Sequence, residues 1–250
     1  MSMGKQLHTA AAARAGLESA LLARDGFLGP LNILEGAQGF FEAMCSDGDP
    51  KDVLRDWSAD WLIHEVSFKP WPACRHAHAV IDAALELRAG FDVLNDEAIE
   101  VRTYGDALKF CDKPDPKTVI EAKFSLQHCV AICLLRGAPS LEDFELPAIN
   151  DPNVAAIRKR VQVSVGDDYE TRYPARFGAE VSLGDRVMRA EDALGDPENP
   201  VGVAQIQQKA HMLLSAGGLA SAEISSLIEC AMKADQTADD LISKIAEVLS

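Results

Sequence analysis

Several features are missing from this 250-residue sequence, and each absence narrows the possibilities. No run of about 18 apolar residues occurs, so we expect no membrane-spanning helix. The first residues contain no apolar segment of the signal-peptide type, which favours a cytoplasmic protein. No glycine-rich phosphate-binding loop is present, because the pair Gly217-Gly218 is typical of a break between helices.

Positive charge is also scarce in this chain. Its 24 lysines and arginines are outnumbered by 39 aspartates and glutamates, which gives a formal net charge of −15. A chain of this charge is a poor partner for nucleic acid or for an anionic membrane surface. A local group of lysine, arginine and histidine can nevertheless bind a small anionic substrate.

The six cysteines do not form the pattern of a disulfide framework or of an iron–sulfur site. Their scattered spacing is typical of reduced thiols in a cytosolic protein. They stand at Cys45, Cys74, Cys111, Cys129, Cys133 and Cys230. Because Cys129 and Cys133 are four residues apart on a predicted apolar helix, we expect both to pack in the core.

The order of the predicted elements indicates an α+β protein. Hydrophobic residues make up 48% of the chain, which is enough for a sizeable core. Helical patterns dominate both ends, whereas short alternating segments lie in the middle. We therefore expect a partial helical domain built from residues 1–67 and 197–250, and a smaller lid-like α+β domain over residues 68–196 with an antiparallel sheet.

The individual elements follow from the same patterns. Strands are expected over residues 61–68, 99–104 and 160–165, and as a hairpin of residues 175–183 and 186–190. Helices are expected over residues 6–24, 36–44, 74–89, 117–135 and 152–158, from Pro30 onward for a short distance, and with breaks over 199–250.

The densest chemistry lies in one stretch of ten residues. A residue before proline favours extended backbone, and a proline suits the first turn of a helix. The stretch should therefore lie where an extended segment becomes a helix, with backbone N–H groups partly free to hold a carboxylate. It reads Lys69-Pro70-Trp71-Pro72-Ala73-Cys74-Arg75-His76-Ala77-His78.

This stretch allows two other interpretations. Cys74 and His78 are four residues apart and could share a helix face as zinc ligands, but no second cluster completes a tetrahedral site. They could also form a Cys–His nucleophile pair, but no oxyanion-hole motif accompanies them. We therefore predict no metal site.

Further segments extend this stretch into a pattern that covers nearly the whole chain. After residues 69–78 comes Ile81-Asp82-Ala83-Ala84, and the other segments are Lys5-Gln6-Leu7-His8, Gly26-Phe27-Leu28-Gly29-Pro30, Phe124-Ser125-Leu126-Gln127-His128 and 195–200. In this order they resemble the 2-methylcitrate dehydratase (MmgE/PrpD) family, which also includes cis-aconitate decarboxylase and iminodisuccinate epimerase.

The resemblance implies a lyase or isomerase that acts on a small di- or tricarboxylic acid without a cofactor. Its chemistry would begin with proton abstraction next to a carboxylate, followed by loss of a β-hydroxyl or by return of the proton on the other face. The implied catalytic residues are Lys5, His8, Lys69 and His78. The implied substrate-binding residues are Cys74, Arg75, His76 and Gln127.

The chain also departs from the family pattern in two respects. Family members are about twice as long, and this sequence corresponds to their C-terminal half. We therefore expect a homodimer or a partner chain that supplies the remaining helices; a non-catalytic fragment or subunit, or a binding module without turnover, are the alternatives. In the decarboxylase branch a histidine stands at the position of Cys74 and a catalytic tyrosine near Phe110, so decarboxylation of that kind is not expected.

Overall fold

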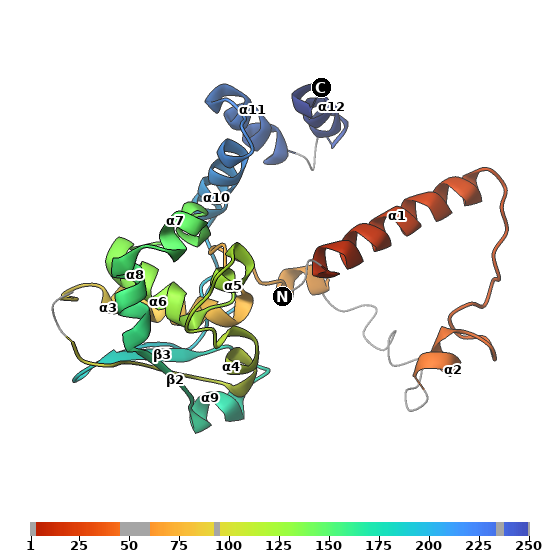
Figure 1. Ribbon diagram of the computed structural model, residues 1–250. Helices are drawn as coiled ribbons and strands as arrows, with labels where there is room; N and C mark the ends of the chain where they lie inside the picture. The colour runs from red at the N-terminus through yellow and green to blue at the C-terminus, as the bar shows by residue number, and fades with distance from the viewer. Residues whose placement is uncertain (1–3, 46–60, 93–95, 234–237, 250) are drawn as a thin grey trace. The chain divides into compact units, whose positions relative to one another are not determined.

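The computed structural model describes residues 4–45, 61–92, 96–233 and 238–249. They divide into two compact units, Met1–Leu62 and Ile63–Ser250 (Figure 1). The relative position of the two units is not determined. The grouping of both chain ends into one helical domain therefore stays a prediction.

The first unit consists mainly of one helix. α1 (Gly4–Arg24) agrees with the helix predicted over residues 6–24, and apolar side chains along it, including Leu7, Leu17 and Leu22, are exposed. The short α2 (Phe40–Met44) is the last part of the helix predicted over residues 36–44.

The short helix predicted to begin at Pro30 is wrong, because residues 31–35 form turns. The carbonyls of Ile33 and Leu34 accept hydrogen bonds from the amides of Phe40 and Phe41, at 2.7 Å and 3.1 Å. These bonds span seven residues, so the two carbonyls are engaged in a loop closure and not in a helical ladder.

The second unit contains a four-stranded mixed sheet. Its strands lie where the sequence predicted them. β3 pairs antiparallel with both β1 and β4, and Val181 lies opposite Val101. The strands are β1 (Ile99–Thr103), β2 (Val161–Val165), β3 (Ala179–Leu183) and β4 (Arg186–Ala190), in the spatial order β2-β1-β3-β4.

One pairing shows that the predicted antiparallel sheet was wrong. β1 and β2 run parallel, with Ile99 opposite Val161 and Thr103 opposite Val165. Between the two strands the chain makes a long helical crossover, which begins with α4 (Gly105–Cys111) and ends with α8 (Pro152–Arg160). Parallel neighbours require such a crossover, whereas a tight turn joins only antiparallel strands. The α+β class is confirmed, with a mixed sheet.

α3 (His78–Leu87) lies at the centre of the core. It packs against β3, β4 and α6 (Leu126–Arg136), and α6 packs in turn against α8, so these helices cover one face of the sheet (Figure 1). Ile81 and Leu87 of α3 are fully buried. A helix that is apolar on most sides is stable only when neighbours cover it all round. The start of α3 is therefore held in a fixed position.

Two predicted elements next to the candidate site differ in the structure. The strand expected over residues 61–68 is wrong: Leu62–Glu65 form a 3-10 helix, η2, and residues 66–70 belong to no strand. The helix expected over residues 117–135 is divided into α5 (Val119–Lys123) and α6. Ser125 causes the division, because its hydroxyl caps α6 by accepting a hydrogen bond from the His128 amide at 3.0 Å.

Four short helical segments were not predicted: α4 and two others in the crossover between β1 and β2, and one between β2 and β3. Besides α4 they are η4 (Glu142–Phe144), α7 (Leu146–Ile149) and α9 (Asp167–Arg172). Each is seven residues or shorter, too short for an apolar period to appear in the sequence. α8 agrees with the helix predicted over residues 152–158, and Asp151 caps it: its carboxylate accepts a bond from the Asn153 amide at 2.9 Å.

Three helices follow the sheet: α10 (Val203–Ala216), α11 (Ser221–Ala231) and α12 (Ala238–Leu249). α10 packs against α11, and α11 against α12. The predicted break at Gly217-Gly218 separates the first two. Across the described ranges, no helix combines the length and the apolar character needed to cross a membrane.

Candidate active site

The stretch that carries the chemistry is an extended segment that turns into α3, as the sequence predicted. Regular helix does not begin at Cys74, because Arg75–Ala77 form a 3-10 turn, η3, and α3 begins at His78. The Cys74 amide is fixed from outside by the Lys123 carbonyl, at 2.8 Å. Cys74 and His78 are therefore not successive members of one α-helical face.

Two buried or half-buried carboxylates attach this stretch to the loop of residues 192–199, which follows β4. Asp82 on α3 accepts hydrogen bonds from the Trp71 indole at 2.8 Å and from the Leu194 amide at 2.7 Å. Asp196 accepts one from the Ser67 hydroxyl at 2.7 Å. Burial raises the pKa of Asp82, and the two donors oppose that rise. The extended segment is thus clamped at both ends.

Arg75 extends from η3 into this clamp. Its Nη2 atom is ion-paired with Asp196, and its guanidinium lies over the Phe177 ring, 4.6 Å from the centroid. Its Nη1 atom is buried and has no hydrogen-bond partner among the described residues. A buried donor without a partner is unfavourable, and its presence is typical of a site that awaits a ligand acceptor.

His78 is the second group with unused polar atoms. It is fully buried, and neither ring nitrogen has a hydrogen-bond partner of good geometry within the described part of the chain. Burial, reinforced by the positive charges of Arg75 and Lys69, lowers the pKa of His78 from 6.5 to about 3; the nearby Ala73 carbonyl acts weakly in the other direction. The imidazole is therefore neutral at physiological pH and able to accept a proton.

Lys69 has an exposed side chain at the edge of this group. Its charge contributes to the low pKa of His78, so the two groups interact through space. Lys69, Arg75 and His78 form what we call the cationic cluster. Its two permanent positive charges adjoin a buried neutral base.

His76 lies beside the cationic cluster in an aromatic environment. Its Nδ1 atom is hydrogen-bonded to the Tyr104 hydroxyl at 2.9 Å, and its ring stacks on Phe110 at 5.2 Å between centroids. Tyr104 in turn stacks on Tyr173 at 4.3 Å. Burial raises the pKa of Tyr104, so the phenol stays protonated.

Cys74 and Gln127 have structural partners. Contact with Cys74, followed by burial, raises the pKa of Cys111, and burial raises the pKa of Cys129; these two thiols stay protonated. The Gln127 amide donates to Asp112 at 2.7 Å and accepts from the Lys113 amide at 3.2 Å, which anchors the loop after α4. Substrate binding by Cys74 and Gln127 stays a prediction.

Lys5 and His8 lie on α1, in the other unit. His8 is exposed, and the Lys5 side chain is outside the described residues. Because the two units are not placed relative to each other, a catalytic role for either residue stays a prediction.

All six cysteines are free thiols. Among the described residues, no group of three or more His, Cys, Asp or Glu side chains could hold a metal ion.

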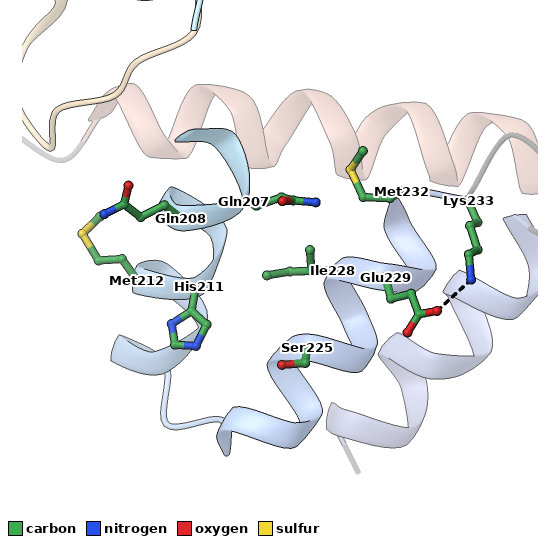
Figure 2. A pocket seen from close by; sticks show the side chains of 9 residues that line it. All are labelled: Gln207, Gln208, His211, Met212, Ser225, Ile228, Glu229, Met232 and Lys233. Atoms are coloured by element: carbon green, nitrogen blue, oxygen red, sulfur yellow. Dashed lines mark hydrogen bonds and ion pairs between the residues drawn. The ribbon is translucent and has the colours of Figure 1, made fainter. Parts of the chain in front are cut away.

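A separate groove of about 680 Å³ lies between α10 and α11 (Figure 2). His211 of α10 and Ser225 and Ile228 of α11 line it, together with an ion pair between Lys233 and Glu229 at 2.7 Å. The positive charge of this groove is neutralised within the groove itself. It therefore lacks the excess cationic charge that the start of α3 provides.

Comparison with known proteins assigns the chain. Residues 71–233 match the MmgE/PrpD C-terminal domain, and residues 1–52 match the MmgE/PrpD N-terminal domain. The chain belongs to the MmgE/PrpD family. The first match includes η3, α3 and the whole sheet, so the cationic cluster beyond Lys69 lies on family structure.

Named members of the MmgE/PrpD family are similar to this chain. Cis-aconitate decarboxylase of Mus musculus is 31% identical over 189 residues, which are 72% of this chain and 38% of that protein. The same enzyme of Homo sapiens is 29% identical over 173 residues. 2-Methylcitrate dehydratase of Cupriavidus necator is 29% identical over 149 residues, which are 57% of this chain and 31% of that protein. The chain spans about a third of the length of these relatives.

Sequence reasoning missed three residues of this site: Asp82, Tyr104 and Asp196. Asp82 stood in a segment that the motif already included, so its position on the helix face next to Trp71 was a usable signal. Tyr104 and Asp196 are 28 and 121 residues from their partners His76 and Arg75. Only the fold brings such distant residues together.

Proposed function

We propose that this MmgE/PrpD chain carries part of the active site of a lyase that acts on a small tricarboxylic acid. The single observation that supports the proposal most is the cationic cluster, in which Arg75 Nη1 and both ring nitrogens of His78 are buried and have no hydrogen-bond partner among the described residues. The relatives named above, a cis-aconitate decarboxylase and a 2-methylcitrate dehydratase, favour the same substrate class.

The proposed reaction begins with removal of a proton next to a carboxylate. Neutral His78 accepts the proton, and Arg75 and Lys69 stabilise the enolate-like charge that develops on the carboxylate. A bound carboxylate also offsets the two positive charges that lower the pKa of His78. His78 therefore becomes a stronger base when the substrate is present than in the empty site.

The second half of the reaction is dehydration: the β-hydroxyl takes up the proton held by His78 and leaves as water, while the electron pair of the broken C–H bond forms the double bond. We favour it over decarboxylation because Cys74 is buried against Cys111 and because Phe110, which has no hydroxyl, stacks on His76. Neither position offers the acid that decarboxylation of the expected kind would use. Epimerisation, with the proton returned on the other face, is the remaining outcome of the same first step.

Proton exchange tests the common first step. The full 250-residue chain is incubated in D₂O with citrate, 2-methylcitrate and cis-aconitate, and deuterium incorporation next to the carboxylates is followed by NMR. We expect exchange for at least one acid and its loss in His78→Gln. Absence of exchange for every acid, from a chain that is folded and binds them, contradicts proton abstraction and favours a binding module.

A second candidate function is that of a subunit that needs a partner, either a second copy or another chain. Exposed apolar side chains favour it: Leu7, Leu17 and Leu22 on α1, and Ile242 on α12. Exposed apolar surface of this kind is typical of association sites. Light scattering after size-exclusion chromatography, with and without exchange activity in the same fractions, discriminates a self-sufficient monomer from an obligate assembly.

A further inference from the structure

Asp196 is held in place before any ligand binds. The residue is 5% exposed, and Ser67 Oγ donates to its Oδ1 atom at 2.7 Å. Its amide donates to the Ala193 carbonyl, and its own carbonyl accepts from the Asn199 amide, both at 3.0 Å. Side chain and backbone of Asp196 are therefore fixed independently of Arg75.

Asp196 in turn fixes the orientation of Arg75. One guanidinium nitrogen, Nη2, is ion-paired with Asp196, and the guanidinium plane rests on the Phe177 ring. A guanidinium is rigid and planar, so fixing one nitrogen and one face fixes the direction of the other nitrogen. That other nitrogen, Nη1, is the buried donor that lacks a partner in the described part of the chain.

We propose that Asp196 is a positioning residue that holds Arg75 so that Nη1 meets a carboxylate of the substrate. This inference rests on the proposed function and deepens it, because it assigns a role to a residue outside the motif of residues 69–78. Asp196 does not touch the substrate. Its negative charge opposes the binding of an anion nearby. Asp196 can therefore favour substrate binding only through the orientation that it gives to the Arg75 guanidinium.

This opposition of charge and geometry makes the proposal testable by the sign of one effect. Asp196→Asn removes a negative charge next to an anion site, so electrostatics alone strengthens the binding of a tricarboxylate. If Asp196 positions Arg75, the same substitution weakens binding roughly tenfold or more. The Arg75 guanidinium is then no longer held in the required orientation, so the contact between its Nη1 atom and the ligand carboxylate is lost. The probe is tricarballylate, a tricarboxylate without a hydroxyl group, titrated into the full chain by calorimetry.

Asp192→Asn is the matched control. Asp192 lies in the same loop, and it pairs with Arg176 at 2.7 Å instead of Arg75. Both substitutions change the net charge by the same amount, so a comparison of the two removes the general electrostatic effect. We expect Asp192→Asn to bind tricarballylate as tightly as the wild type, or slightly more tightly.

A double substitution separates positioning from a general structural role. Arg75→Lys keeps the charge but loses the forked geometry, so it should weaken binding about as much as Asp196→Asn does. The double variant should bind tricarballylate no more weakly than either single variant, because both substitutions act on the same contact. Additive losses, or Asp196→Asn binding as tightly as Asp192→Asn, overturn the proposal.

Two further outcomes have defined meanings. If Asp196→Asn does not fold, Asp196→Glu decides, because it keeps the charge and displaces the carboxylate by one methylene; unchanged affinity in that variant overturns the proposal. If the folded wild type neither binds tricarballylate nor exchanges protons with any acid, the proposed function itself is wrong. A wild type that binds, with variants that bind equally well, refutes only the role of Asp196.

Discussion

Gly195 and Phe68 are in direct backbone contact. The Phe68 amide donates to the Gly195 carbonyl at 2.8 Å, and a Cβ atom at position 195 would lie only 2.1 Å from the Phe68 carbonyl oxygen. This contact attaches the loop of residues 192–199 to the extended segment that leads to Lys69. Two segments far apart in the sequence, around residues 68 and 195, therefore lie side by side at the candidate site.

Gly195→Ala should be strongly destabilising. The new methyl group meets a backbone atom that has little room to move, and the residue has a φ of +99°, which disfavours any side chain. The two effects together should lower the free energy of unfolding by roughly 3 kcal/mol or more, measured by urea denaturation. Tricarboxylate binding should be lost with it.

Gly218→Ala is the control for that prediction. Gly218 has a similar φ of +93°, but nothing lies within 4 Å of a Cβ atom there. Only the backbone effect remains, so we expect a loss of about 1 kcal/mol. Equal losses in the two variants would show that the contact with Phe68 contributes nothing.

Much of the second unit could be predicted from its sequence. The positions of all four strands and of α3 follow from alternation, helical periodicity and the turn at Gly184. The parallel pairing of β1 with β2 could not, because alternation identifies a strand but not its neighbour. Which strand lies beside β1 depends on how the crossover helices pack, and no local pattern records that.

The break between α5 and α6 is a local feature that the single helix predicted over residues 117–135 does not contain. Apolar periodicity runs through Phe124 and Ser125, and it outweighed the presence of a residue that caps helices well. Ser125 is fully buried; its hydroxyl accepts from the His128 amide and donates to the Lys113 carbonyl at 2.6 Å. Ser125 therefore both caps α6 and holds the Lys113 carbonyl. Only the first role can be predicted from the sequence.

Ser125→Ala should lower the free energy of unfolding by more than the substitution of an ordinary N-cap residue does. It removes both hydrogen bonds and leaves the Lys113 carbonyl without that partner, so we expect a loss of about 2 kcal/mol. Thr118→Ala is the comparison: Thr118 caps α5 at 3.2 Å in an exposed position, and about 0.5–1 kcal/mol should be lost. Urea denaturation of both variants provides the test, and a larger loss for Thr118→Ala would contradict it.

The candidate site shows the same limit of sequence reasoning. Residues 69–78 stand out because their chemistry is concentrated in one stretch. The burial of His78 could not be predicted from that stretch: its ring is fully buried and its nitrogens lack partners in the described residues, while its catalytic role stays a prediction. Burial depends on tertiary packing around α3, where Asp82 is bonded to Trp71 and to Leu194 of the loop after β4.

Lys69→Ala should separate activity from stability. The side chain is exposed, so the melting temperature should hardly change, whereas proton exchange should fall roughly a hundredfold or more as one stabilising charge is lost. Lys159→Ala, an exposed lysine on α8, removes the same charge far along the chain from the motif and should leave exchange unchanged. Equal exchange rates in the wild type and in Lys69→Ala would remove Lys69 from the mechanism.

The two buried histidines should make the fold sensitive to acid. In the folded chain the pKa of His78 is about 3 and that of His128 about 4, both lowered mainly by burial from an ordinary 6.5. Between pH 6.5 and pH 4 the unfolded chain therefore takes up protons that the folded chain does not. Stability is retained above pH 6.5 and falls as the pH drops, by about 1.4 kcal/mol per pH unit for each histidine.

Substitution of His78 should remove one of these two contributions. Urea denaturation of His78→Gln between pH 7 and pH 4 should show about half of the wild-type loss of stability per pH unit, since only His128 still titrates in this way. His64→Gln, at an exposed position on η2, should keep the full wild-type dependence. Parallel curves for the wild type and His78→Gln would mean that His78 takes up its proton equally well in both states, and that the folded chain does not hold it as a buried neutral base.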